Sequence, residues 1–211
     1  MTLRRIVLFS AIIAAVGIPI WLDGASHVKW MEVSMLLAEF AIAFVIYYEL
    51  EENRANSFLA EAHGEAYQGR VDIYDSFVDD CSNSATLEQR AEAFAEVIKK
   101  NATLSKKCDL QLLFFSKSTY VLRRSLFHHD LMIQWFPQVL IRLHFMLWSY
   151  MAVRESPMVW RDSFRAAVRE SLDKHLHESN RDITIYSSKT QNVVKITCDH
   201  MRRMRDSISM E

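Results

Sequence analysis

The chain has 211 residues, half of them hydrophobic, and a formal net charge of −1. This length and this hydrophobic content leave room for one modest core domain and an anchor. Four glycines and three prolines disfavour a turn-rich all-β fold, and three separated cysteines without a CxxC pair argue against a disulfide framework or a cysteine zinc site. The composition therefore predicts a mostly α fold in a reducing compartment.

Two apolar runs predict a two-helix transmembrane hairpin over residues 1–50. Residues 6–22 contain no charged side chain, and residues 33–48 contain only Glu39. A spanning helix needs roughly 17–25 apolar residues, a length that the second run reaches once it begins near residue 31. We therefore expect spans at about 6–22 and 31–48. Aromatic side chains stand at their ends, as at a membrane interface: Trp21, Trp30, Tyr47 and Tyr48.

The basic side chains near the hairpin predict its orientation. Arg4 and Arg5 precede the first run, whereas the connector has a single basic residue, Lys29. The positive-inside rule then places both termini in the cytoplasm, and we expect the bacterial inner membrane. Two alternatives remain open: a cleaved signal peptide, or burial of residues 34–48 in a soluble core.

Glu39 is the most informative residue of the hairpin. A carboxylate at membrane depth costs about 2.5–3.5 kcal/mol on insertion scales unless it is paired or hydrated. Glu39 is therefore either a pore-lining or helix-contact residue of an oligomer, or a protonated carboxyl that hydrogen-bonds a neighbour. Because two short helices cannot enclose a pore, conduction would require several copies.

The remaining chain predicts a stalk and linker over residues 51–70 and a helical cytosolic sensor or interaction domain over residues 71–211. Helical character continues to about Ala62, with interruptions expected at His63-Gly64 and Gly69-Arg70. Residues 51–85 carry eight acidic and two basic side chains, whereas residues 86–211 carry fourteen acidic and twenty basic ones. This asymmetry makes the distal part the candidate for contact with phosphates.

Four helices are expected in the domain before its C-terminal segment. They cover residues 87–101, with a capping box at Thr86, and then residues 110–127, 138–154 and 157–178. The third is short for a membrane span and contains Arg142 and His144, so we expect a buried core helix.

The C-terminal segment has apolar or small residues three and four apart from residue 183 to residue 208. This spacing predicts one long amphipathic helix that could join subunits in a coil, with a short strand at residues 182–188 as the alternative.

Arg161, Arg165 and Arg169 recur every four residues, so they share one face of the fourth helix. The planar guanidinium fork donates two hydrogen bonds at once to a phosphate, and three in a row predict a ladder for a phosphate-rich ligand. The alternative is a solvated face with pairs to Asp162 and Asp173.

The densest polar cluster lies between residues 117 and 130. Basic, hydroxyl and aromatic side chains alternate there, as recognition of phosphates and bases requires. Tyr120 would stack on a base, while Arg123 and Arg124 would pair with phosphates; the alternative is a partly exposed helix end. The candidate ligand-binding residues of this cluster are Lys117, Tyr120, Arg123, Arg124, His128 and His129.

Two overlapping Arg-x4-His pairs, Arg123 with His128 and Arg124 with His129, resemble the motif of the all-helical HEPN-type ribonucleases. The resemblance implies that histidine supports proton transfer and that arginine steadies the phosphate charge. We nevertheless assign no catalytic residue and expect a protein that is not an enzyme. With no HExxH, Walker or dinucleotide motif, we also expect no metal site and no cofactor.

The hairpin, the uninterrupted stalk and the basic helices around residues 123–129 and 161–169 form a layout that resembles small bacterial two-transmembrane effectors of antiviral defence. It is most similar to the CRISPR-associated membrane effector gated by cyclic tetra-adenylate. The resemblance implies a homo-oligomeric cytosolic sensor, a bound cyclic oligonucleotide, and membrane disruption or depolarisation as the output. Two other functions remain open: a structural or assembly subunit of a membrane complex, and a membrane-tethered ribonuclease.

Overall fold

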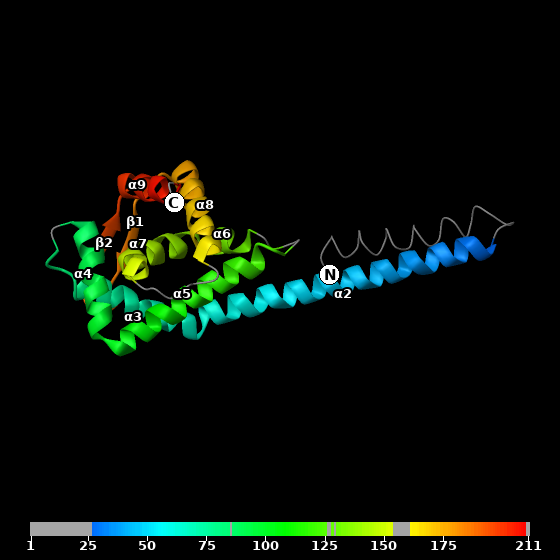
Figure 1. Ribbon diagram of the computed structural model, residues 1–211, viewed down its shortest axis with the longest axis horizontal. Helices are drawn as coiled ribbons and strands as arrows, with labels where there is room; N and C mark the ends of the chain where they lie inside the picture. The colour runs from blue at the N-terminus through cyan, green and yellow to red at the C-terminus, as the bar shows by residue number, and fades with distance from the viewer. Residues whose placement is uncertain (1–26, 85, 126–127, 129, 154–160, 210–211) are drawn as a thin grey trace. The chain divides into compact units, whose positions relative to one another are not determined.

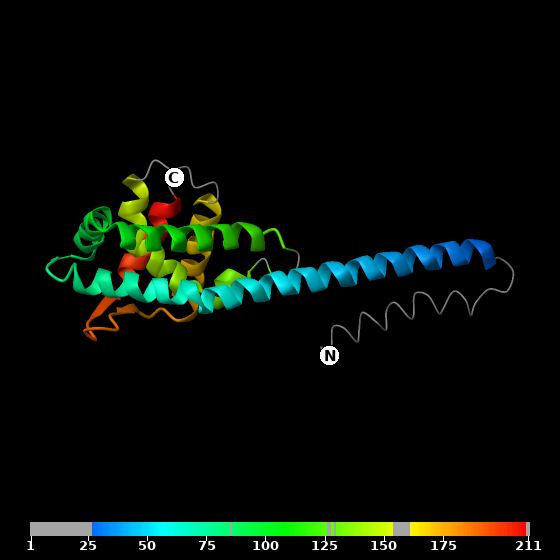
Figure 2. The same cartoon turned by 90° about the horizontal axis from the view of Figure 1, so that it is seen from below.

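The computed structural model describes residues 27–84, 86–125, 128, 130–153 and 161–209, and over these residues the protein is mostly helical (Figures 1 and 2). The mostly α prediction is confirmed. The chain divides into two compact units, one up to Arg54 and one from Ala55 onward. The described elements are α2 (His27–His63), α3 (Glu65–Asp79), α4 (Leu87–Lys100), α5 (Ala102–Leu122), α6 (Leu131–Trp135), α7 (Pro137–Val153), α8 (Arg161–Glu178), β1 (Ile183–Tyr186), β2 (Val193–Ile196) and α9 (Cys198–Ser209).

The predicted hairpin is described in part. The first predicted span, residues 6–22, lies outside the described residues, whereas residues 31–48 belong to α2. Within the described part of the chain, no helix combines the length and the apolar character that crossing a membrane requires.

The break between α2 and α3 falls at the predicted His63-Gly64 step. Gly64 leaves helical geometry, with φ −89° and ψ −122°. The Ala62 carbonyl, left without a helical partner, accepts a hydrogen bond from Arg70 Nη2 at 2.8 Å. A buried side chain that follows the break therefore satisfies the end of α2.

The second predicted interruption, at Gly69-Arg70, is wrong, because α3 continues through both residues. A Cβ on Gly69 would lie 3.2 Å from Gln111 Nε2, and that amide donates a hydrogen bond to the Ala66 carbonyl at 2.9 Å. Glycine at position 69 lets the Gln111 side chain of α5 approach the backbone of α3 closely, and it does not form a turn. The structure thus explains the residue type by packing between two helices.

One hydrophobic core joins the helices of the unit that begins at Ala55. Phe77 of α3 meets Phe94 of α4 and Phe145 of α7 edge to face, with ring centroids 5.3 Å and 6.3 Å apart. Five apolar residues of α7 are fully buried: Leu140, Ile141, Leu143, Met146 and Leu147. The prediction of a buried core helix over residues 138–154 is therefore confirmed.

Side-chain caps define the ends of α4 and α5. Thr86 Oγ1 accepts a hydrogen bond from the Gln89 amide at 3.2 Å, so the predicted cap of α4 is confirmed. Asn101 follows α4 directly, and its Oδ1 accepts from the Leu104 amide at 3.0 Å. The expected start of the next helix at residue 110 is wrong, because this cap starts α5 at Ala102.

The single long helix predicted over residues 183–208 is wrong, and the alternative, a strand at its beginning, is confirmed. β1 and β2 form an antiparallel hairpin with Ile183 opposite Ile196 and Tyr186 opposite Val193. Their β-branched residues alternate between the core and the surface, which suits a half-buried strand. Only α9 remains helical, and Met201 packs its apolar side into the core.

Two carboxylates of α3 hold the loop between the strands. Asp75 accepts hydrogen bonds from the Ser188 amide at 2.5 Å and from its hydroxyl at 2.7 Å. Asp79 accepts from the hydroxyls of Thr190 and Ser187 at 2.5 Å and 2.7 Å. The hydroxyls of Thr190 and Ser187 hold the pKa of Asp79 below its ordinary value of 3.8.

We expect acid to release this loop. Because the pKa of Asp79 is lower in the folded chain, its contribution to stability is complete above its ordinary pKa and is lost as the pH falls through the lowered one. Hydrogen exchange, corrected for intrinsic rates, should show amides 187–192 losing protection as the pH falls below the ordinary value of 3.8, before the amides of α7 do. In Asp79→Asn the loop should exchange faster at neutral pH and change little on acidification. Loop protection that persists in the acidified wild type until the α7 amides open would contradict this expectation.

Candidate functional site

The structure connects the two basic clusters predicted from the sequence. Arg123, which follows α5, donates from Nη2 to Glu170 Oε1 of α8 at 2.5 Å, and both side chains are partly exposed. This ion pair brings the end of α5 beside the helix that carries Arg165 and Arg169. The predicted clusters therefore border one another, with a carboxylate between them.

The aromatic ring predicted to stack on a base already has a cation over it. The Arg124 guanidinium lies 3.7 Å from the centroid of the Tyr120 ring, within the range of a cation–π interaction. Lys117 is exposed one turn earlier on α5. A base could use this face of Tyr120 only after Arg124 moved.

The Arg-x4-His pairs are described incompletely. His128 is half-buried, and its backbone amide donates to Ser125 Oγ at 3.1 Å, while His129 lies outside the described residues. Arg123, the partner of His128 in the motif, is bound to Glu170. Of the two histidines in the ribonuclease-like motif, the structure therefore describes His128, and its motif partner Arg123 already pairs with the carboxylate of Glu170.

The arginine ladder divides along α8. Arg161 begins the helix and its side chain lies outside the described part of the chain, Arg165 is half-buried, and Arg169 is exposed. Asp173, expected to pair along the ladder, lies 3.8 Å from Arg205 of α9. Arg165 lines a cavity.

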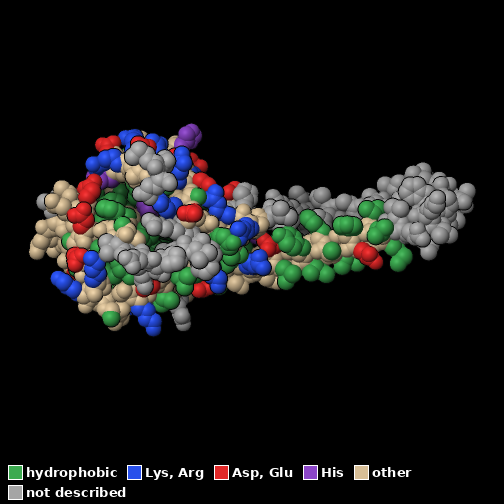
Figure 3. Space-filling model, viewed as in Figure 1, with side chains coloured by type: hydrophobic (Ala, Val, Ile, Leu, Met, Phe, Trp, Pro, Cys, Tyr) green, Lys and Arg blue, Asp and Glu red, His purple; other side chains and the backbone are tan. Residues whose placement is uncertain are grey.

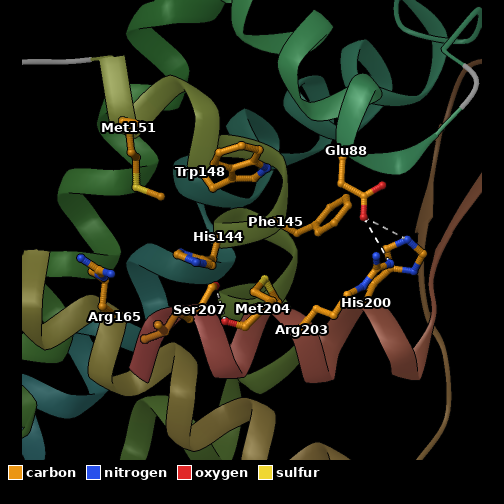
Figure 4. Close-up of a pocket in the computed structure, with 12 residues that line it drawn as sticks. Glu88, His144, Phe145, Trp148, Met151, Arg165, His200, Arg203, Met204 and Ser207 are labelled. Atoms are coloured by element: carbon orange, nitrogen blue, oxygen red, sulfur yellow. Dashed lines mark hydrogen bonds and ion pairs between the residues drawn. The ribbon is translucent and has the colours of Figure 1, made fainter. Parts of the chain in front are cut away.

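That cavity has a volume of about 420 Å³ and lies between α4, α7, α8 and α9 (Figure 4). Its apolar wall consists of Phe145, Trp148 and Met151 from α7, with Met204 and Ile208 from α9. Small-molecule sites in proteins are mostly apolar clefts of about 300–1,000 Å³ with a few placed polar groups. The cavity has the size and the lining of such a site.

Polar groups gather at two places on its wall. Glu88 Oε1 of α4 lies 3.3 Å from Arg203 Nη2 and 3.4 Å from His200 Nε2, both on α9. Figure 4 shows Arg165 on the other side of the cavity, with His144 and Trp148 between. Arg203 and His200 thus lie beside the Glu88 carboxylate at one end of the cavity. The indole of Trp148 lies in the middle, and the Arg165 guanidinium lies at the other end.

No family model, curated protein or solved structure matches the chain. Its function must therefore be inferred from the chemistry of its own residues.

Sequence reasoning found one residue of this cavity and missed the others. Arg165 belongs to the predicted ladder, and His144 was interpreted as a core residue, which agrees with its nearly complete burial. Trp148 lies on a helix that supplies much of the core, yet it is 39% exposed. The exposure of this tryptophan marks the cavity, and the exposure of a side chain cannot be read from the sequence.

Metal ligands do not gather in the described residues. Within that part of the chain, no group of three or more histidine, cysteine, aspartate or glutamate side chains could hold a metal ion. The cysteines Cys81, Cys108 and Cys198 are all free thiols.

We expect Cys198 to react quickly with a thiol reagent, and Cys81 and Cys108 to react slowly. Burial raises the pKa of Cys81 to about 11 and that of Cys108 to about 12, so little thiolate forms at either, whereas Cys198 is half-buried. A thiol-disulfide colour reagent at mildly alkaline pH should modify Cys198 first and all three cysteines only in denaturant. Cys198→Ser should remove the fast phase; equal reaction of all three in the native chain would contradict the burial.

Proposed function

We propose that the chain is a membrane effector of bacterial antiviral defence that lies in the inner membrane with both termini in the cytoplasm. In this proposal residues 6–48 form a hairpin in the bilayer, and a homo-oligomeric helical domain binds a cyclic oligonucleotide. Ligand binding leads to membrane disruption or depolarisation. The observation that carries the proposal is the apolar surface of α2.

Apolar side chains cover α2 on every side between residues 35 and 50. Phe40 is 73% exposed, and the exposed large apolar residues cover more than half of the helix circumference. The remaining arc carries half-buried residues that are also mostly apolar, among them Ala41, Val45 and Tyr48. Figure 3 shows the hydrophobic side chains along this stretch on the face in view. The exposed set is Met35, Leu36, Leu37, Phe40, Ile42, Phe44, Ile46, Tyr47 and Leu50.

A helix that is hydrophobic all round lies in a core or in a membrane, because it presents no polar face to water. The charge-free run at residues 6–22 supplies a second segment of the same character. These two segments support the hairpin, and the exposed Glu39 on α2 supplies a group for contact between copies within the bilayer.

The input side of the proposal rests on the basic residues of the helical domain. Arg123 and Arg124 at the end of α5 and Arg165 on α8 are the guanidiniums that a phosphate-rich ligand would meet. Because α2 runs as one helix from His27 to His63, we propose that it transmits the change to the apolar stretch.

Flotation tests the membrane part. The full chain should float with liposomes of bacterial lipids, and the double variant Phe40→Lys and Ile42→Lys should lose most of this association, because each buried ammonium costs about 2.5–3.5 kcal/mol. The matched control is Leu110→Lys, which places the same charge on an exposed leucine of α5. A wild-type chain that stays in the aqueous fraction would overturn the anchor.

Dye release tests the gating part. Proteoliposomes of the full chain should leak after addition of cyclic tetra-adenylate, and leakage should fall at least tenfold in the variant Arg123→Ala and Arg124→Ala. Insertion without ligand-dependent leakage would overturn the effector proposal and favour an assembly subunit. Cleavage of RNA by the same preparation, lost in His128→Ala, would favour the ribonuclease.

A further inference from the structure

We infer that the cavity between α4, α7, α8 and α9 binds a small uncharged aromatic molecule of one or two rings. This inference goes beyond the proposed function, whose ligand is a charged cyclic oligonucleotide. It rests on the apolar side chains that meet at the cavity and on the partners that the charged side chains of its wall already have.

Large apolar side chains of two helices meet at the cavity without being fully buried. Trp148 of α7 is 39% exposed, and Met204 and Ile208 of α9 are half-buried. Met201, one turn earlier on the same side of α9, is fully buried in the core. The apolar side of α9 therefore loses part of its cover where it reaches the cavity. A bound apolar molecule would remove this remaining surface from water, which favours binding.

The positions of Trp148 and Met204 suit a flat ring. Figure 4 shows the indole of Trp148 on one side of the cavity, with the thioether of Met204 opposite. Aromatic rings stack on an indole face, and a polarizable sulfur makes favourable contacts with a ring. Phe145 and Met151 extend the same wall along α7. The lining therefore favours an aromatic ligand over a branched aliphatic one.

The charged side chains that the structure describes on the wall already have partners within the protein. Glu88 Oε1 lies 3.3 Å from Arg203 Nη2 and 3.4 Å from His200 Nε2. The other ring nitrogen of His200, Nδ1, lies 2.5 Å from Thr197 Oγ1. Arg165, at the other end, also interacts with a partner of its own. A charged ligand would have to displace one of these partners, whereas an uncharged ring leaves each contact in place.

The volume of the cavity limits the size of the ligand. About 420 Å³ is near the lower end of the range for small-molecule sites, which suits a molecule of one or two rings. Apolar cavities in proteins take up small aromatic molecules of this kind. The ring and the absence of charge are therefore the two requirements to test.

Photolabelling of the detergent-solubilised full chain tests the site. Benzophenone is uncharged, has two rings and inserts on irradiation into nearby methionine side chains, which mass spectrometry then locates. We expect adducts at Met204 and Met151 to saturate as the probe concentration rises. Adducts at Met35, an exposed methionine of α2, should rise without saturation, because they report probe that is dissolved in the detergent.

Two competitors separate the ring from the charge. Indole should reduce the labelling of Met204 at least about fivefold at saturation and leave that of Met35 unchanged. Indole-3-carboxylate has the same ring with a carboxylate, and it should need at least about a tenfold higher concentration for the same protection, because its charge must be desolvated. Equal protection by the two competitors would overturn the requirement for an uncharged ligand.

Matched substitutions locate the ligand. Trp148→Leu removes the stacking face and Ile208→Trp fills the cavity, so each should reduce the saturable labelling of Met204 at least about fivefold. Trp135→Leu is the control, because Trp135 is an exposed tryptophan outside the lining. Melting curves establish that each variant is folded before irradiation.

The outcomes decide the inference independently of the membrane proposal. Labelling of Met204 that rises without saturation, as at Met35, or that neither Trp148→Leu nor Ile208→Trp reduces, would overturn the inference even if the chain floats with liposomes. Saturable labelling that indole prevents, in a chain that does not float, would leave the inference standing and remove the effector.

Discussion

Phe77→Ala should lower the free energy of unfolding by about 3–5 kcal/mol, the range for removal of a buried aromatic side chain. Phe77 has no exposed surface and its ring joins three helices, with Phe94 of α4 and Phe145 of α7 edge to face against it. Alanine would leave a cavity where α3, α4 and α7 meet. Edge-to-face pairs add about 0.5–1.5 kcal/mol beyond the buried area, so the loss should fall in the upper part of the range.

Urea unfolding of the full chain, followed by far-ultraviolet circular dichroism, measures this change. The thermal midpoint should fall by about 10 °C or more for a chain of this length. Leu113→Ala is the control, because Leu113 is exposed on α5 and its truncation opens no cavity. A shift for Phe77→Ala no larger than that for Leu113→Ala would mean that the three rings do not form the centre of the core.

Arg70→Met should lower the free energy of unfolding by about 3 kcal/mol, because it leaves the buried end of α2 without a donor. Arg70 is only 4% exposed, and its guanidinium bonds to the Ala62 carbonyl and lies about 5.5 Å from the centroid of the Phe115 ring. Burial lowers the pKa of Arg70, so the hydrogen bond and the neighbouring rings must offset the loss of hydration. Methionine fills similar space but donates no hydrogen bond.

The effect of Arg70→Met should also be local. Hydrogen exchange should accelerate at residues 60–66 more than in α7, since the Ala62 carbonyl marks the end of α2. Arg70→Lys should recover part of the stability, because an ammonium can reach the carbonyl but does not stack as a planar fork. Arg202→Met, on the exposed side of α9, should leave the midpoint unchanged. Equal midpoints for Arg70→Met and Arg202→Met would contradict the capping role.

Signals that lie within one turn of the chain were reliable guides to the fold. Thr86 and Gln89 predict the start of α4 because a cap involves residues three apart, and the structure has that hydrogen bond. Gly64 predicts the end of α2 for the same local reason. The apolar run at residues 138–154 predicts a core helix because its length and its polar residues exclude other uses.

Signals that depend on distant partners misled the prediction. Gly69 is typical of a turn, yet it lies inside α3 because Gln111, from another helix, occupies the space of its missing side chain. Residues 183–208 repeat at helical spacing, yet the first half pairs as a hairpin whose loop is held by Asp75 and Asp79. In both cases the deciding atoms lie far away in the sequence.

The candidate site divides in the same way. Arginine spacing along one helix identifies Arg165 and Arg169 as neighbours, because that relation is local. Assigning Arg165 to a cavity requires α7 and α9 beside α8, and the ion pair of Arg123 with Glu170 joins residues 47 positions apart. Trp148, His200 and Arg203 carry no local motif that would mark them.

The sequence by itself determined that this protein is mostly helical, where several of its helices begin and end, and that its N-terminal fifty residues are unusually apolar. These properties follow from spacing, capping and composition, which involve neighbouring residues only. The tertiary structure alone decided which face of each helix is buried, that a β-hairpin replaces the first half of the predicted C-terminal helix, and that α4, α7, α8 and α9 line a cavity. Those outcomes depend on contacts between segments far apart in the chain, where packing overrides local preference.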